Sequence, residues 1–289
     1  MDFAGLKPMY VLYHRDNDGF GAAWAAWLQF GDRAEYISVQ YGEKMPKLEP
    51  GTYIYIVDFC VKEQELKALI ANHKSVVVID HHKTSADLVK SIKAPNFAYR
   101  HDISKSGCEL SWEEFHGDDP IPELLSYIGD MDLWKWELPY SKEVNAAIDS
   151  YPTTFSNWSI ISKKIDSLKL EGASILRYID AQVTKICKRA ELVSFFDEGI
   201  VPMVGSTEYI SRIGNDLCDI YSQRKFAVVF FDFVNGDRVF LLRSKGDFDV
   251  SGIAEKYGGG GHKNAAGFKK SHRTGALTPE KVKVSLGTH

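Results

Sequence analysis

The chain has 289 residues, enough for two domains of ordinary size, and its 44% hydrophobic and 26% charged content is typical of a globular protein. No run approaches eighteen apolar residues, which excludes a membrane-spanning helix, and the net charge of −4 argues against a protein that coats long nucleic acid. The four cysteines form no CxxC pair, so we expect neither a disulfide framework nor a zinc ribbon, and a reducing cytoplasm fits best.

The first half of the chain alternates between apolar runs and helical patterns. Strands are predicted at 9–14, 53–59 and 75–80, and helices at 19–30 and 63–73 lie between or beside them. The apolar runs are nearly continuous, which fits strands that are covered on both faces. Strands that alternate with helices in this way predict a parallel sheet.

The second half begins with helical patterns and ends in a fresh set of strands. An amphipathic stretch at 173–196 predicts a long linker helix. Strands are predicted at 199–205, 225–234 and 238–244, and the VNGDR turn between the last two predicts an antiparallel hairpin. The expected fold is therefore a bilobal α/β protein, in which a parallel-sheet domain and a smaller mixed-sheet domain are joined by a helical linker. The expected boundaries are 1–150 for the first domain, 151–198 for the linker region and 199–289 for the second domain.

Potential metal ligands follow each of the three N-terminal strands. In chain order they are His14, Asp16, Asp18, Asp58, Asp80, His81 and His82. In an open α/β sheet, ligands bind at the carboxyl ends of the strands, so we expect these side chains at one edge. If the chain stays extended beyond the first strand, His14, Asp16 and Asp18 share a face.

A cluster of four carboxylates at one edge would be self-repelling, and a bound cation removes that conflict. Mixed imidazole and carboxylate ligands suit a divalent transition metal, and a carboxylate-rich set favours Mn²⁺ over Zn²⁺. Seven ligand groups are too many for one ion but suit two, which is the usual apparatus of phosphoryl hydrolysis. An aspartate at a strand end is often only a helix N-cap, but that explanation is weak for three strands that end alike.

Five motifs of this sequence resemble those of the DHH phosphoesterase superfamily, and they occur in the expected order. They are His14-x-Asp16-x-Asp18-Gly19, Val57-Asp58-Phe59, Asp80-His81-His82, Ile128-Gly129-Asp130, and Gly258-Gly259-Gly260-Gly261-His262 with Ala265-Ala266-Gly267-Phe268. The last of these resembles the glycine-rich motif of the DHH-associated domain. The helical stretch from about 140 to 198 matches no motif of the family.

The resemblance implies a dinuclear Mn²⁺ centre in the first lobe, for which Mg²⁺ or Co²⁺ could substitute. His14 and Asp16 resemble ligands of one metal, and Asp18 and His81 resemble ligands of the other. Asp58 matches the bridging position between the two ions.

The fourth motif and the DHH tripeptide imply further roles. Asp130 resembles the fourth-motif ligand of the second metal, and Asp132 is the runner-up for that role. Asp80 and His82 are the predicted catalytic residues: Asp80 is expected to orient a histidine, and His82 is expected to face the substrate phosphate.

The second lobe is expected to bind the substrate phosphate. Glycines let the backbone approach an anion closely, so Gly259, Gly260, Gly261 and His262 are predicted substrate-binding residues, although a flexible turn is the alternative. Arg243 is a candidate phosphate clamp because its planar fork suits bidentate binding, and a solvated arginine fits the sequence equally well.

The favoured function is a Mn²⁺-dependent phosphodiesterase that degrades short oligonucleotides or linear dinucleotides, as in the nano-RNase branch of the family. Residues 224–270 carry nine Lys/Arg and five Asp/Glu, which fits a small anionic substrate. An exopolyphosphatase or pyrophosphatase is the alternative enzyme, and a catalytically inactive nucleic-acid-binding module is the alternative from another class. We expect a cytoplasmic protein with no membrane partner and no long duplex partner, and the sequence leaves a homodimer open. Trp134 and Trp136 could stack a base, but packing in the core or between lobes is the favoured expectation.

Overall fold

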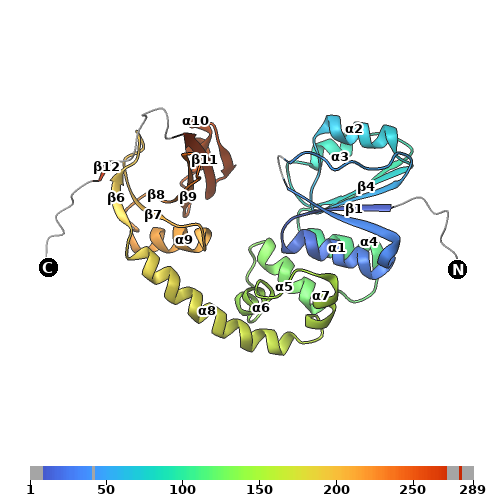
Figure 1. Cartoon of the computed structure of the whole chain (residues 1–289), viewed down its shortest axis with the longest axis horizontal. Helices are drawn as coiled ribbons and strands as arrows, with labels where there is room; N and C mark the ends of the chain where they lie inside the picture. The colour runs from blue at the N-terminus through green and yellow to red at the C-terminus, as the bar shows by residue number, and fades with distance from the viewer. Residues whose placement is uncertain (1–8, 41–42, 272–279, 282–289) are drawn as a thin grey trace. The chain divides into compact units, whose positions relative to one another are not determined.

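The computed structural model describes residues 9–40, 43–271 and 280–281. The chain divides into two compact units, Met1–Leu176 and Arg177–His289. The first carries an all-parallel sheet and the second a mixed sheet, which confirms the predicted fold class (Figure 1).

The sheet of the N-terminal unit has the strand order β2-β1-β3-β4-β5, and every neighbouring pair is parallel. Its strands are β1 (Met9–His14), β2 (Ala34–Val39), β3 (Tyr53–Val57), β4 (Ser75–Asp80) and β5 (Phe97–His101). The three predicted strands are confirmed as β1, β3 and β4, which lie side by side in the middle of the sheet. The edge strands β2 and β5 were not predicted, because their sequences mix polar and apolar residues and are only partly buried.

Helices cover both faces of this sheet, and Figure 1 shows α1 and α4 on one face with α2 and α3 on the other. Their bounds are α1 (Asn17–Phe30), α2 (Glu63–Asn72), α3 (Ala86–Ser91) and α4 (Gly107–His116). Alternate strand residues point to opposite faces. Val57 and Ile79 belong to the core under α1 and α4, whereas Ile56 and Val78 pack with Leu66 of α2. This double burial explains the continuous apolar runs of the central strands.

Four further helices follow the first sheet. They are α5 (Glu123–Asp132), α6 (Ser141–Ile148), α7 (Phe155–Ile161) and α8 (Ile165–Cys187). The helix predicted at 173–196 is wrong at both ends, because α8 starts earlier and stops at Cys187. The predicted helix continued beyond Cys187, but strand β6 (Glu191–Ser194) lies there instead. Val193 and Phe195, two residues apart, are buried in the core of the C-terminal unit, which is the spacing of a strand.

The C-terminal unit has a sheet with the order β10-β11-β9-β8-β7-β6-β12. Its remaining elements are β7 (Ile200–Gly205), α9 (Ile210–Ile220), β8 (Phe226–Asp232), β9 (Asp237–Ser244), α10 (Ser251–Lys256), β10 (Gly260–His262), β11 (Ala265–Ser271) and β12 (Glu280–Lys281). The predicted hairpin is confirmed as the antiparallel pair β8–β9. Ile253 of α10 is buried on one face, and Ile213 of α9 is buried on the other with Val183 of α8.

All four cysteines are free thiols. Across the described stretches 9–40, 43–271 and 280–281, none of the helices has the length and apolar character that crossing a membrane requires.

Candidate metal centre

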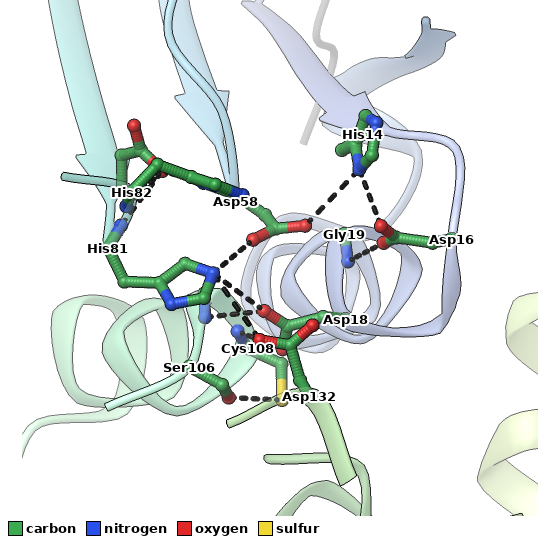
Figure 2. Close-up of polar contacts among 12 residues, drawn as sticks. His14, Asp16, Asp18, Gly19, Asp58, His81, His82, Ser106, Cys108 and Asp132 are labelled. Atoms are coloured by element: carbon green, nitrogen blue, oxygen red, sulfur yellow. Dashed lines mark hydrogen bonds and ion pairs between the residues drawn. The ribbon is translucent and has the colours of Figure 1, made fainter. Parts of the chain in front are cut away.

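The parallel sheet brings the predicted ligands together at one edge. β1, β3 and β4 are neighbours, so His14, Asp58 and His81, which end or follow these strands, meet at their carboxyl ends. Figure 2 shows their side chains turned toward one another, with Asp58 in the middle.

The chain does not stay extended beyond His14, so the shared face expected from an extended segment is wrong. It turns directly into α1, and Asp16 is the N-cap of that helix: one oxygen of its carboxylate accepts a hydrogen bond of 2.8 Å from the Gly19 amide. The other oxygen lies 2.5 Å from His14 Nδ1. Burial opposes ionisation of Asp16, but the hydrogen bonds from His14 and Gly19 outweigh it and lower its pKa. Asp16 is therefore both a helix cap and a member of the cluster.

Asp58 stands between two groups of potential ligands. Its Oδ2 lies 3.8 Å from His14 Nδ1, and its Oδ1 lies 3.2 Å from His81 Nε2. The residue is 1% exposed and has a φ of 64°, in the left-handed region that non-glycine residues rarely adopt. Such strain persists only where the surroundings impose it, and it is frequent at functional sites. Here it turns the two carboxylate oxygens toward opposite halves of the cluster.

The second half of the cluster forms around His81. Its Nε2 lies 3.6 Å from an oxygen of Asp18 and 3.5 Å from an oxygen of Asp132. The ligand atoms of these three residues all lie within 4.8 Å of one another, as do those of His14, Asp16 and Asp58. A third group of ligand atoms within that distance consists of Asp58, His81 and His82. The described residues thus present three overlapping groups of three ligands, and Asp58 belongs to two of them.

The N-terminus of α4 fixes Asp18. Its two carboxylate oxygens accept hydrogen bonds from the amides of Gly107 and Cys108, at 2.6 and 2.9 Å. The partial positive charge of a helix N-terminus favours this buried carboxylate. A Cβ at Gly107 would lie 2.4 Å from an oxygen of Asp58, so only glycine allows the helix to approach both carboxylates. The S-x-x-E pattern from Ser106 to Glu109 marks the start of α4, but it does not reveal that Asp18 lies there.

The structure separates the two candidates for the fourth motif. Asp132, at the end of α5, lies beside His81 and Asp18. Asp130 instead accepts a hydrogen bond of 2.9 Å from the Glu137 amide through one oxygen, and it lies in none of the ligand groups found among the described residues. Sequence reasoning preferred Asp130 because the family motif ends there, whereas the geometry favours the runner-up.

The electrostatics of the cluster fit a site for a divalent cation. Burial, together with the charges of Asp18 and Asp16, raises the pKa of Asp58 well above its usual range. The same causes raise the pKa of Asp132 to about 8, and burial lowers the pKa of His81. Asp58 Oδ1 and His81 Nε2 are buried and have no hydrogen-bond partner within the described residues. Buried polar atoms without partners are costly, and a divalent ion would satisfy both.

Asp80 organises the DHH segment and lies slightly behind the ligands. It is fully buried, and its Oδ1 lies 2.7 Å from His82 Nδ1 and accepts the His81 amide at 2.8 Å. The Ser85 hydroxyl donates to its other oxygen. Burial opposes ionisation of Asp80, but these hydrogen bonds keep its pKa below the usual value, and its hydrogen bond raises the pKa of His82. A carboxylate only accepts, so Nδ1 of His82 carries a proton. Ser85 was not predicted, because nothing in its spacing distinguishes it.

The C-terminal unit holds the other predicted residues. Arg243 of β9 and His262 of β10 both pair with Ala265 of β11, from its two sides, which puts their side chains on the same face of the sheet. The Arg243 guanidinium donates 3.0 Å to the Ser211 hydroxyl of α9. Arg243 is therefore a packed residue rather than a freely solvated one.

The glycine run forms the end of α10 and the start of β10. The Gly259 amide donates 2.8 Å to the Ala254 carbonyl, so it closes the helix and is engaged within the chain. Gly260 and Gly261 pair with Gly267 and Ala266 of β11. Gly261 has a φ of 144° and a Cβ there would lie 2.5 Å from Ala266 Cα, so this position requires glycine for backbone packing.

Comparison with known proteins agrees with this geometry. Residues 8–128 match the DHH family, N-terminal domain, and residues 203–282 match the DHHA1 domain. The chain is also 31% identical over 299 residues to uncharacterized protein R106 of Acanthamoeba polyphaga mimivirus, an alignment that covers 94% of this chain and 70% of that protein. The chain belongs to the DHH phosphoesterase superfamily. The family predicted from the motifs is thereby confirmed, and this DHH phosphoesterase is a metal-dependent phosphoric ester hydrolase.

Two further proteins resemble this DHH phosphoesterase over nearly its whole length. Oligoribonuclease NrnB of Bacillus subtilis (strain 168) is 25% identical over 303 residues, which cover 90% of this chain and 72% of NrnB. The solved structure of the pGpG-specific phosphodiesterase PggH from Vibrio cholerae is 16% identical, has a TM-score of 0.53, and aligns over 93% of this chain and 95% of PggH. At 16% identity, the likeness to PggH supports the fold alone.

Proposed function

We propose that this DHH phosphoesterase hydrolyses phosphodiester bonds in short oligonucleotides or linear dinucleotides and uses two divalent cations. The observation that carries the proposal is the position of Asp58, whose two oxygens face His14 and His81 on opposite sides. Two ions that share a carboxylate lie close together, which is the arrangement used for phosphoryl hydrolysis. The likeness to oligoribonuclease NrnB supports a nucleotide as the substrate.

The ligand set favours particular ions. In the proposed assignment His14 and Asp16 would hold one ion, Asp18, His81 and Asp132 would hold the other, and Asp58 would serve both. His82 also lies in a ligand group with Asp58 and His81, but it is assigned to the substrate because its Nδ1 is held by Asp80. Four carboxylates and two imidazoles suit Mn²⁺, and Mg²⁺ or Co²⁺ are the expected substitutes. When bound, the ions would supply an activated water and neutralise charge on the phosphoryl oxygens.

The remaining chemistry falls to side chains of the DHH segment. Asp80 holds His82 through Nδ1, so the ring keeps one orientation, and the raised pKa of His82 favours its protonated form. A protonated imidazole can donate a hydrogen bond to a phosphoryl oxygen or a proton to the leaving oxygen. His82 is thus proposed to act on the substrate, and Asp80 to position it.

The C-terminal unit is proposed to bind the rest of the substrate. Arg243 and His262 lie on one face of its sheet, which gives that face two groups able to donate hydrogen bonds to phosphate. The predicted boundaries, with a catalytic domain at 1–150, a linker region at 151–198 and a substrate-binding domain at 199–289, stay a prediction.

The test is a substrate panel with purified protein and added Mn²⁺. It compares pApA, pGpG, pAp, cyclic dinucleotides, short RNA, polyphosphate and pyrophosphate, and each is run beside an Asp58→Asn variant. The expected result is preferential turnover of linear dinucleotides or short RNA that the variant loses. Preferential turnover of polyphosphate or pyrophosphate would instead favour the alternative enzyme, and no turnover of any compound would contradict the proposal.

A further inference from the structure

A pair of tryptophans directly follows the metal-binding end of α5. Trp134 is 65% exposed and therefore does not pack in the core, which was one of the two kinds of packing expected from the sequence. Its ring stands edge to face with that of half-buried Trp136, with centroids 5.1 Å apart and planes inclined by 75°. The ammonium of Lys142 lies 5.6 Å from the centre of the Trp136 ring. Trp136 is thereby packed from two sides, whereas Trp134 presents indole surface to solvent.

Asp130 holds the turn that carries these tryptophans. Its carbonyl accepts from the amides of Lys135 and Trp136, at 2.9 and 3.4 Å, and its carboxylate accepts from the Glu137 amide at 2.9 Å. The Trp134 amide donates 2.9 Å to the Met131 carbonyl. The segment therefore folds back tightly onto the last turn of α5, the turn that ends with Asp132.

The backbone of this turn is strained at both tryptophans. Trp134 and Trp136 both have a φ of 55°, in the left-handed region. This conformation is a genuine outlier for a bulky side chain, and it is costly at each position. A chain that needed only to end a helix could use glycine here at no such cost.

The location connects the exposed ring to the phosphate chemistry. Trp134 is two residues beyond Asp132, so their Cα atoms are at most about 7.6 Å apart. Asp132 lies 3.5 Å from His81 in the ligand cluster. The exposed ring therefore belongs to the residues next to the cluster that would hold a substrate phosphate.

From these contacts we infer that Trp134 is a base-stacking platform for the substrate, and that Trp136, Lys142 and Asp130 position it. The inference rests on the proposed function and extends it by naming a residue that selects nucleotides over polyphosphate. Stacking on an aromatic face accepts every base, so the platform favours nucleotides in general and leaves base identity to other contacts.

The test separates stacking from phosphate chemistry by changing the substrate as well as the protein. Steady-state kinetics with Mn²⁺ compare pApA with its abasic analogue, which keeps the sugars and the phosphodiester. Trp134→Leu should raise KM for pApA roughly 5- to 100-fold and leave kcat and the kinetics of the abasic analogue nearly unchanged. Trp134→Tyr should restore most of the affinity, because it keeps a ring that can stack. Asp130→Ala removes the carboxylate that holds the Glu137 amide but keeps both carbonyl contacts, so it should raise KM for pApA by less than Trp134→Leu does.

Tyr53→Leu is the matched control. Tyr53 is 40% exposed and has Lys74 over its ring, but it begins β3, at the other end of the sheet from the ligands. Its removal should leave both substrates unaffected. If Trp134→Leu leaves KM for pApA unchanged, or raises KM for both substrates alike, the platform is refuted while the proposed function stands. If the wild type turns over no nucleotide, the proposed function fails. The stacking role of Trp134 is then tested by pApA binding, measured through tryptophan fluorescence. Equal affinity of the wild type and Trp134→Leu would refute that role.

Discussion

Replacing Asp58 with asparagine tests the shared carboxylate most directly. The substitution keeps the shape of a side chain that is 1% exposed and removes only its ability to carry charge. Burial and neighbouring carboxylates raise the pKa of Asp58 well above its usual range, so its negative charge is unfavourable in the metal-free protein. Metal-free Asp58→Asn should therefore be no less stable than the wild type, because the amide has the same shape and carries no charge.

The difference should appear when Mn²⁺ is added. An ion at one hundred times its dissociation constant stabilises the folded state by about 2.7 kcal/mol. For a unit of the size of Met1–Leu176, that corresponds to a rise in Tm of about 5–11 °C. Asp58 contacts both ligand groups, so Asp58→Asn should lose most of the rise, and kcat/KM should fall more than about 100-fold.

Thermal unfolding with EDTA and then with increasing Mn²⁺ measures both effects. Asp166→Asn is the control, because that carboxylate is 96% exposed and lies outside the cluster. It should show the full Mn²⁺-dependent rise. The reasoning is refuted if Asp58→Asn keeps the whole rise in Tm, or if it turns over the best substrate at the wild-type rate.

Three further predictions follow from the same cluster. Gly107→Ala places a Cβ 2.4 Å from an Asp58 oxygen, so Mn²⁺ affinity and kcat/KM should fall about 10- to 100-fold. Gly252→Ala is the control, because a Cβ there meets open space, and it should change neither quantity. Unchanged Mn²⁺ binding by Gly107→Ala would contradict the close approach of α4 to Asp58. His82→Ala should lower kcat about 10²- to 10⁴-fold and retain two ions by elemental analysis, and loss of the ions would make His82 a ligand instead. Without metal, the folded state holds protons on Asp58 and Asp132 that the unfolded state releases near pH 4, so the free energy of unfolding should fall as pH rises from about 4 to about 8. Urea unfolding with EDTA measures that slope, Mn²⁺ should abolish it, and a metal-free stability that rises over the same range would show that the carboxylates are not buried together.

The sequence predicted the parts of the site that follow from strand position. His14, Asp58 and His81 end or follow adjacent parallel strands, and the topology of a parallel sheet alone brings such residues together. Asp16 could be recognised both as an N-cap and as a ligand, and the structure shows that the two roles are compatible. Apolar runs were sufficient to locate β1, β3 and β4, because these strands are buried on both faces.

The other parts depend on contacts that no local pattern encodes. Gly107 matters because α4 packs against Asp18 and Asp58, which are far from it in the sequence. The choice between Asp130 and Asp132 depends on the turn after α5, where the backbone of Asp130 is engaged by Lys135 and Trp136. The end of α8 was missed because tertiary burial, and not helix propensity, selects a strand at β6.

The turn held by Asp130 connects the proposed ion site at Asp132 with the proposed base-stacking residue Trp134. Asp132 and Trp134 lie on the same few residues, which are tied together by three amides that donate to Asp130. Anything that draws Trp134 toward a base would therefore also shift Asp132 in the ion site. Linkage is reciprocal, so the ion should tighten the hold on the nucleotide by the same factor by which the nucleotide tightens the hold on the ion. Loss of either the ion or the nucleotide would then weaken the binding of the one that remains.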